Sequence, residues 1–322
     1  FLPPSPGFRQ GGGAGDGSGR ILAGWMLEFQ HTMAEIKPEL ALFDFEKPLQ
    51  PLYHKAGKLM AETPVNERKL AAVSADIQKV TAKIYKGLNN WQLTQVARHV
   101  ARPYSLDYIG KIFTDWQELH GDRNFRDDAS TVCGVARFDG QSVVVVGQQK
   151  GRSTEENIRR NFGYPQPEAY RKALRFFKFA EKFNKPVITL IDTPGAFPGL
   201  EGEERSQGEA IARNLREMAG LKVPIIAVII GEGGSGGALG IGVANKVLML
   251  EYSVYSVISP ESCASILWRS SDEKIIAAKA LKNDAKTALK FGIIDEIIPE
   301  GLGGAHRDPD TTAANIRKSL KR

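Results

Sequence analysis

Cysteine is scarce in this sequence, and its scarcity excludes two kinds of small stabilised domain. The 322 residues include two cysteines, Cys133 and Cys263, which are too few for a disulfide framework or for a zinc site with four cysteine ligands. A chain of this length can bury roughly 75% of the surface that its unfolded form exposes, so it needs neither kind of cross-link. We therefore expect a reducing, cytoplasmic location and no metal bound by this chain.

Long hydrophobic runs and an excess of one charge are also missing. The longest apolar run, residues 223–230, ends at a cluster of glycines, whereas a membrane-spanning helix needs about 20 apolar residues. Lysine and arginine number 43 against 37 aspartates and glutamates, and the net charge of +6 is spread between acidic residues rather than gathered in a run. The sequence therefore predicts no membrane span, and it makes nucleic acid an unlikely partner.

The chain changes character twice along its length. Residues 1–32 are rich in glycine, proline and serine, and Met33 follows them, so we expect a leader or a vector-derived segment there; a transit peptide is the alternative. Residues 33–116 are predicted to be a helical segment, with Ile84, Leu88 and Trp91 on one helical face. Residues 117–322 are predicted to form one α/β domain.

Short apolar runs alternate with amphipathic stretches in this second part, which is typical of repeated β-α units. Tyr170, Leu174 and Phe177 share one face of a predicted helix over 169–183, with Lys172 on the opposite face, and a second helix is predicted over 204–218. Strands are predicted at 142–146, 187–191, 225–230, 247–250, 254–258 and 293–298. Several lack polar alternation, as strands buried on both faces do.

Residues 231–237, GEGGSGG, form the most informative motif. Five of these seven residues are glycine, and they join a buried strand to a short helix. Backbone N–H groups at such a turn can approach an anion, or a carbonyl that gains negative charge, at the positive end of the helix dipole. Close packing of the strand against the helix is the structural alternative.

Two other chemical interpretations share these glycines. Gly231, Gly233 and Gly236 match the dinucleotide-binding pattern G-x-G-x-x-G, but about nine residues before the next strand are too few for its crossover helix. Ser235 lies in a G-x-S-x-G pattern that is typical of serine hydrolases, with Asp295 and His306 as the other members of a triad. His306 falls in a polar, glycine-rich stretch that we expect to be a surface loop.

A second turn, IDTPGAFPG at 191–199, favours an oxyanion-binding site without a nucleophile from this chain. Gly195 and Ala196 can present their N–H groups there, and the two turns can face one cavity. A third motif, GQQKG at 147–151, places Lys150 beside a group of arginines, Arg152, Arg159 and Arg160, which we expect to form an anion-facing edge. A solvated basic loop is the alternative there.

The chain resembles the α subunits of bacterial acetyl-CoA carboxylase carboxyltransferase. The resemblance begins near Leu88 and is carried by WQLTQVARH, RPYSLDYI, GQQKGR, IRRNFGYPQPEAYRKALR, IDTPGAFPG, EERSQGEAIARNLREM, GEGGSGGALGIG, YSVISPESCASILW and GGAHRD. It implies a crotonase-like fold, a spiral of ββα units. The family usually continues beyond the position of Arg322, so the C-terminus is expected to be shortened.

The resemblance also implies partners and a reaction. Its members pair with a β subunit, usually as α2β2, and move a carboxyl group from carboxybiotin on the biotin carboxyl carrier protein to acetyl-CoA, which gives malonyl-CoA for fatty-acid synthesis. A separate biotin carboxylase uses the ATP. This chain has neither Met-Lys-Met, the biotin attachment pattern, nor GxxxxGK[ST], so it is expected to be neither the carrier nor the ATP-using component.

The family's pattern assigns roles to six residues of this sequence. Gly236 and Gly237 would hold the ureido oxygen of biotin as its carboxyl group leaves, while Gly195, Ala196, Lys150 and Gly151 would line the same pocket. No acid or base side chain is required, because the ureido nitrogen can take the proton. The alternatives are a carboxyltransferase subunit for another acyl-CoA, such as propionyl-CoA, and, from a different class, a nucleic-acid-binding protein.

Overall fold

The computed structural model describes residues 42–322, and contacts along the chain divide it into two units, residues 1–50 and 51–322. The expected leader at 1–32 lies outside the described residues. The described part of the first unit is the 3-10 helix η1 (Asp44–Leu49). Residue 116, the predicted end of the helical segment, lies inside the first strand, and the predicted division of the chain into domains stays a prediction.

The second unit is built on one eight-stranded sheet. Its strands are β1 (Thr114–Glu118), β2 (Thr131–Phe138), β3 (Gln141–Gln148), β4 (Val187–Thr193), β5 (Ile225–Gly234), β6 (Lys246–Leu250), β7 (Val254–Ser256) and β8 (Glu296–Ile298). Their order is β1-β2-β3-β4-β5-β6-β8, with β7 paired to the far end of β5. The pairs β1-β2 and β2-β3 are antiparallel, and all the others are parallel. The carboxyl ends of β3, β4 and β5 therefore lie side by side.

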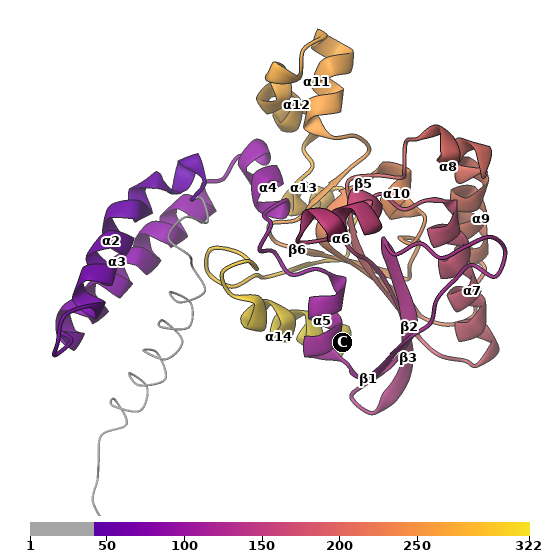
Figure 1. Ribbon diagram of the computed structural model, residues 1–322, viewed down its shortest axis with the longest axis horizontal. Helices are drawn as coiled ribbons and strands as arrows, with labels where there is room; N and C mark the ends of the chain where they lie inside the picture. The colour runs from indigo at the N-terminus through magenta and orange to yellow at the C-terminus, as the bar shows by residue number, and fades with distance from the viewer. Residues whose placement is uncertain (1–41) are drawn as a thin grey trace, which may run out of the picture. The chain divides into compact units, whose positions relative to one another are not determined.

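Several helices lie on the two faces of this sheet (Figure 1). The α-helices of residues 42–322 are α2 (Gln50–Met60), α3 (Glu67–Lys86), α4 (Asn90–Ala97), α5 (Ser105–Ile112), α6 (Thr154–Arg159), α7 (Pro167–Lys182), α8 (Leu200–Glu204), α9 (Gln207–Ala219), α10 (Ser235–Leu239), α11 (Pro260–Trp268), α12 (Lys274–Leu281), α13 (Ala285–Lys290) and α14 (Pro309–Leu320), and two further 3-10 turns are η2 (Asn161–Gly163) and η3 (Ser271–Glu273). None of the helices within residues 42–322 is long and apolar enough to cross a membrane.

Alternation along the strands divides the core in two. Val144 and Val146 of β3 pack with Phe176 and Phe177 of α7 on one face, whereas Val145 packs with α5 and α14 on the other. This arrangement follows from the period of two along a strand, and it explains why these strands show no polar alternation in the sequence. The predicted α/β class and the crotonase-like fold are both confirmed.

Three local expectations are wrong. Ile84, Leu88 and Trp91 do not share a helix, because α3 ends before Gly87 and α4 starts at Asn90, with Asn89 capping its N-terminus. Lys172, expected on the solvent face of α7, is fully buried and pairs with Asp127 at 2.6 Å. A charged side chain at an apparently polar helix position is thus neutralised inside the protein rather than solvated.

The third error concerns the strand before the glycine motif. The strand predicted at 225–230 continues as β5 through Gly234, so three of the five glycines lie in a strand and not in a turn. Close neighbours leave no room for a side chain at these positions. A Cβ on Gly233 would lie 2.6 Å from the Tyr255 ring, and one on Gly231 would lie 2.7 Å from the Asp192 carboxyl carbon. Packing, the structural alternative, therefore accounts for this half of the motif.

Candidate functional site

Two glycine turns meet at the carboxyl ends of β4 and β5. The β4 turn contains Gly195 and Ala196, and the β5 turn leads into α10, which contains Gly236 and Gly237. A Cβ on Gly237 would lie 2.6 Å from the Ala196 nitrogen and 2.9 Å from the Gly195 Cα, so the two backbones are in direct contact. The structure brings together these four of the six residues singled out from the sequence.

The first turn of α10 presents backbone donors. The first four N–H groups of any helix lack an acceptor within that helix, and those of Gly236 and Gly237 are among them here. Ser235, which begins α10, adopts a left-handed conformation with φ of 50°, a strained geometry for a residue with a side chain. The sharp change of direction between β5 and α10 is therefore made at Ser235.

Lys150 takes part in a buried cluster of charges. Its Nζ lies 2.7 Å from Asp192 Oδ1 and 2.9 Å from Glu232 Oε2, and its side chain is 13% exposed. Burial by itself lowers the pKa of Lys150, but the two carboxylates outweigh it, and the pKa is raised. The structure thus places this ammonium between two carboxylates of its own chain rather than at an anion-facing edge.

The arginines expected beside Lys150 also bind separate partners. The guanidinium of Arg152 binds Asp107 on α5 at 2.5 Å, and that of Arg160 donates to the Ala129 carbonyl at 2.7 Å. Gly151 is buried against α6: its N–H donates to Asn157 Oδ1, and a Cβ there would lie 2.6 Å from Glu156 Cβ. Lys150, Arg152 and Arg160 therefore do not form the expected basic edge, because each of these three groups has a separate partner.

Arg98, directly after α4, and Glu232 of β5 are site residues that the sequence analysis did not identify. Arg98 Nε lies 2.6 Å from Glu232 Oε1, and its NH1 lies 2.5 Å from Glu261 of α11. Burial raises the pKa of Glu232, but Lys150 and Arg98 together outweigh it and lower that pKa. One sequence feature could have identified Glu232: it is a glutamate within a glycine motif at the end of a buried strand.

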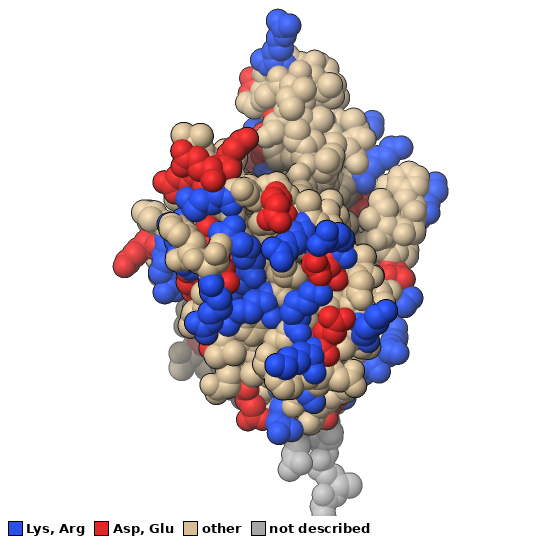
Figure 2. All heavy atoms as spheres, turned by 90° about the vertical axis from the view of Figure 1, so that its right-hand side faces the viewer, with Lys and Arg blue, Asp and Glu red and all other residues tan. Residues whose placement is uncertain are grey.

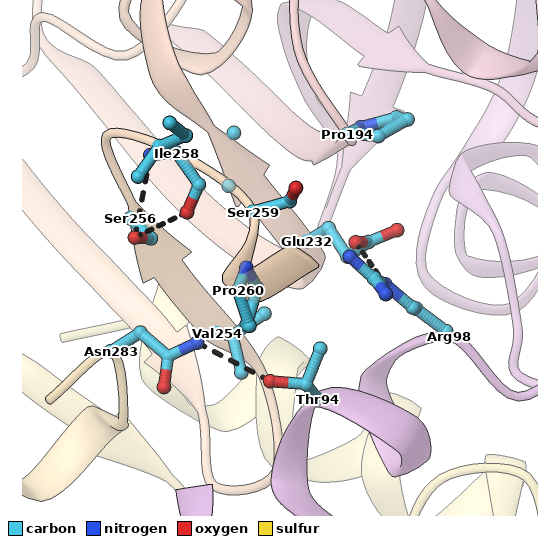
Figure 3. Close-up of a pocket in the computed structure, with 12 residues that line it drawn as sticks. Thr94, Arg98, Pro194, Glu232, Val254, Ser256, Ile258, Ser259, Pro260 and Asn283 are labelled. Atoms are coloured by element: carbon cyan, nitrogen blue, oxygen red, sulfur yellow. Dashed lines mark hydrogen bonds and ion pairs between the residues drawn. The ribbon is translucent and has the colours of Figure 1, made fainter. Parts of the chain in front are cut away.

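A small pocket opens beside these ion pairs (Figure 3). Its walls come from α4, the ends of β5 and β7, and the start of α11; the lining residues are Thr94, Arg98, Pro194, Glu232, Gly233, Gly234, Val254, Ser256, Ile258, Ser259, Pro260 and Asn283. Figure 3 shows Arg98 reaching Glu232, and Asn283 donating to the Thr94 hydroxyl at 3.3 Å. Pro194 and Gly234 connect this pocket to the two glycine turns.

The serine hydrolase interpretation is wrong. Asp295 binds Lys246 at 2.9 Å and the N–H of Val247 at the opposite end of the strands, so it does not orient a histidine. His306 is not in a solvated loop: its ring stacks on His99 with centroids 4.2 Å apart, and burial holds its pKa well below the usual range. The residues of the expected triad therefore do not assemble.

The dinucleotide interpretation is not supported either. The helix after the glycines, α10, has five residues, and β6 starts at Lys246. A crossover helix for a dinucleotide fold would have to be longer. Within residues 42–322, no three His, Cys, Asp or Glu side chains are grouped so that they could hold a metal ion.

Comparison with known proteins identifies the family. The model of the acetyl co-enzyme A carboxylase carboxyltransferase-like family matches residues 42–322. The chain is 55% identical over 283 residues to the acetyl-coenzyme A carboxylase carboxyl transferase subunit alpha of Halorhodospira halophila, covering 86% of this chain and 89% of that protein. It is 56% identical over 297 residues to the subunit of the same name from Chlorobaculum parvum, covering 87% and 88%.

Solved structures share the fold at low sequence identity. The transcarboxylase 12S structure matches with a TM-score of 0.53 and 24% identity over 69% of this chain and 42% of that chain. The β subunit of P. aeruginosa geranyl-CoA carboxylase matches with a TM-score of 0.54 and 17% identity over 73% and 44%. The present chain thus spans less than half of each of these longer chains. From the family match and the close relatives together, the chain belongs to the acetyl-CoA carboxylase carboxyltransferase α-subunit family.

Proposed function

We propose that this chain is the α half of a carboxyltransferase that makes malonyl-CoA from acetyl-CoA and carboxybiotin. The observation that carries the proposal is the contact between the two glycine turns, Gly195–Ala196 and Gly236–Gly237, at the carboxyl ends of neighbouring strands. Ligands of open α/β sheets bind at this edge, and backbone donors there suit an oxygen that gains negative charge.

The transfer has a simple balance of bonds. The bond between N1 of biotin and its carboxyl carbon breaks, and a bond forms between that carbon and the methyl carbon of acetyl-CoA. The methyl proton moves to N1, so biotin and malonyl-CoA are the products. Negative charge develops on the ureido oxygen of biotin and on the thioester oxygen while this happens, and stabilising both charges is the catalytic task.

The residues of this chain divide the task as follows. The N–H groups of Gly236 and Gly237 donate to the ureido oxygen, while Gly195 and Ala196 form the facing wall. Asp192 and Glu232 are paired with Lys150, and the lowered pKa of Glu232 makes it a weak base at neutral pH. The proton acceptor is therefore the ureido nitrogen of the substrate. Lys150 acts through its ion pairs with Asp192 and Glu232, and Gly151 packs on α6, so neither residue is assigned a direct contact with an anion.

Partners complete the site. We propose a β subunit that supplies the donors for the thioester oxygen, an α2β2 assembly, the biotin carboxyl carrier protein as the source of carboxybiotin, and a biotin carboxylase that uses ATP to load it. The subunit name that the relatives share, carboxyl transferase subunit alpha, supports the proposal of a second subunit. The product places the reaction in fatty-acid synthesis. Two free, buried cysteines suit a reducing compartment, and we propose the cytoplasm.

Reconstitution tests the function. This chain, a carboxyltransferase β subunit from one of the relatives' organisms, and a mixture of the two are each assayed for malonyl-CoA-dependent carboxylation of a free biotin derivative. We expect activity in the mixture alone. A panel of acyl-CoA products run in parallel separates acetyl-CoA from propionyl-CoA selectivity. A confirmed complex that transfers no carboxyl group with any of them would contradict the proposal.

Two glycines that begin helices offer a matched pair of variants for the site. In Gly237→Ala the added methyl group must displace the Gly195–Ala196 backbone, so we expect at least a tenfold fall in kcat. In Gly208→Ala, at an exposed position of α9, the methyl group meets no atom within 4 Å, and kcat should change less than threefold. Both complexes are checked for assembly by size-exclusion chromatography. Equal kcat values for the two variants would remove the turn contact from the mechanism.

A further inference from the structure

Gln148 connects the two glycine turns through a single side chain. It is the last residue of β3, its side chain is completely buried, and it lies in the GQQKG motif, to which the proposed reaction gives no direct role. Its Oε1 accepts a hydrogen bond from the N–H of Asp192 at 3.1 Å, and its Nε2 donates to the carbonyl of Gly237 at 2.7 Å. The amide thus reaches from β3 past the end of β4 to α10.

The chemistry of the two contacts requires an amide. The N–H of Asp192 is a donor and the carbonyl of Gly237 is an acceptor, so the side chain between them must offer one acceptor and one donor. A carboxamide offers both from one planar group, and the two partners fix which end is oxygen and which is nitrogen. The amide is also neutral, which suits a position beside the ion pair of Asp192 and Lys150.

The backbone that carries this amide is itself held in place. The hydroxyl of Ser105, at the start of α5, donates to the Gln148 carbonyl at 2.6 Å. A Cβ on Gly147 would lie 2.6 Å from Ser105 Cβ, so α5 packs directly on the end of β3. The side chain of Gln148 therefore extends from a fixed point.

The contact between the two glycine turns restricts the orientation of α10 relative to the end of β4. Gly237 touches Gly195 and Ala196 with its backbone, and the Tyr170 hydroxyl adds only a long contact of 3.4 Å to the Gly237 carbonyl. Rotation of the first turn of α10 would redirect the N–H groups of Gly236 and Gly237. We propose that Gln148 is a positioning residue, which sets the direction of these donors by tying α10 to the end of β4. This inference rests on the proposed function.

The next residue in the chain provides a matched control. Gln149 is also almost fully buried, and its side chain also makes two hydrogen bonds, to the N–H of Leu106 and the carbonyl of Lys150, but neither goes to a glycine turn. Gln148→Met and Gln149→Met each remove two hydrogen bonds at similar side-chain volume. A purely structural role predicts the same effect for both variants.

The test uses the full chain mixed with its β subunit. For Gln148→Met we expect kcat of carboxyl transfer to fall at least tenfold while KM for malonyl-CoA stays within threefold, and for Gln149→Met we expect both constants to stay within threefold. Gln148→Glu, which keeps the acceptor for Asp192 but loses the donor to Gly237, should lower kcat at least as much as Gln148→Met. Equal kcat values for Gln148→Met and Gln149→Met would overturn the inference.

Amide hydrogen exchange gives a readout that does not depend on turnover. We expect exchange in residues 192–196 and 236–240 to accelerate at least fivefold in Gln148→Met and not in Gln149→Met. Unchanged exchange in these segments would overturn the inference even if kcat fell. Absence of transfer in the wild-type mixture would instead contradict the proposed function, and the exchange result would then decide the positioning role by itself.

Discussion

At the scale of single residues, the charges around Lys150 show how burial changes the value of an ion pair. Lys150, Asp192 and Glu232 are removed from water almost completely, whereas the pair Lys246–Asp295 is well exposed. Breaking a buried pair leaves a charge without solvent or partner, and this costs about 3–5 kcal/mol, while an exposed pair contributes roughly 0–1 kcal/mol. The two lysines should therefore respond very differently to the same substitution.

We expect Lys150→Met to lower the free energy of unfolding by about 3 kcal/mol at pH 7.5, and Lys246→Met by less than about 1 kcal/mol. Urea denaturation followed by circular dichroism measures both. Similar losses for the two variants would contradict the buried cluster.

The effect of Lys150→Met should also depend on pH. The folded-state pKa of Glu232 is lowered, so its ionised form stabilises the fold above its unfolded pKa of about 4.3, and this stabilisation is lost as pH falls through the folded value. The pKa of Lys150 is raised, so its contribution is complete below its unfolded pKa of about 10.4. The difference between wild type and Lys150→Met should thus be full at pH 7.5 and smaller below about pH 5, where Glu232 of the variant takes up a proton.

At the scale of elements, the segment between β8 and α14 is held by a fully buried ion pair. Both guanidinium NH groups of Arg102, between α4 and α5, donate to the Glu300 carboxylate at 2.7 and 2.6 Å, and Arg102 Nε donates to the Ile230 carbonyl of β5. Glu300 also accepts from the N–H groups of Tyr252 and Ala305. These contacts fix a glycine-rich segment whose composition indicates an exposed loop.

Glu300→Gln should therefore destabilise the protein by about 3–5 kcal/mol, because the charge of Arg102 stays buried without its counter-ion. The double variant Arg102→Met, Glu300→Leu removes both charges, and we expect it to be more stable than Glu300→Gln. Chemical denaturation of the two variants and the wild type gives the comparison. A double variant that is less stable than Glu300→Gln would show that the segment depends on the hydrogen bonds of Arg102 more than on charge neutrality.

At the scale of the whole molecule, lysines and arginines gather on the face that carries α7 and α9, and several of them are paired with acidic side chains. Figure 2 shows acidic side chains among the lysines and arginines there. Ion pairs such as Arg171–Asp122, Arg205–Glu168 and Lys178–Glu217 account for part of this mixture. Binding to a phosphate backbone needs unpaired cations in a stripe or patch.

We therefore expect only weak binding of duplex DNA, with Kd no tighter than about 100 µM at 150 mM salt, which is the weak end of non-specific binding. Fluorescence anisotropy of a labelled duplex at 50 and 150 mM salt measures it. Micromolar binding with a steep loss between the two salt concentrations would support a nucleic-acid role alongside the family's reaction.

Local patterns in the sequence were sufficient for much of the fold and for the position of the candidate site. The spacing of Tyr170, Leu174 and Phe177 predicts α7 within two residues of its observed bounds, and the apolar runs locate β3, β4, β5 and β6. The two glycine turns could be paired in advance, because parallel strands that are neighbours end at the same edge of a sheet.

Contacts between distant residues were decided only by the tertiary structure. Arg98 meets Glu232 across 134 positions, Arg102 meets Glu300 across 198, and Lys150 turns inward to Asp192 and Glu232. The sequence by itself determined most helices and strands from β3 onward, and the family, because these depend on side-chain period and on long motifs that follow one another along the chain; it missed β1 and β2. It did not determine whether a glycine in GEGGSGG serves packing or a ligand, or whether a lysine faces solvent or a carboxylate. Both outcomes depend on which backbone segment and which charged side chain the tertiary structure places beside the glycine or the lysine. Burial then determines how strongly each contact contributes to stability.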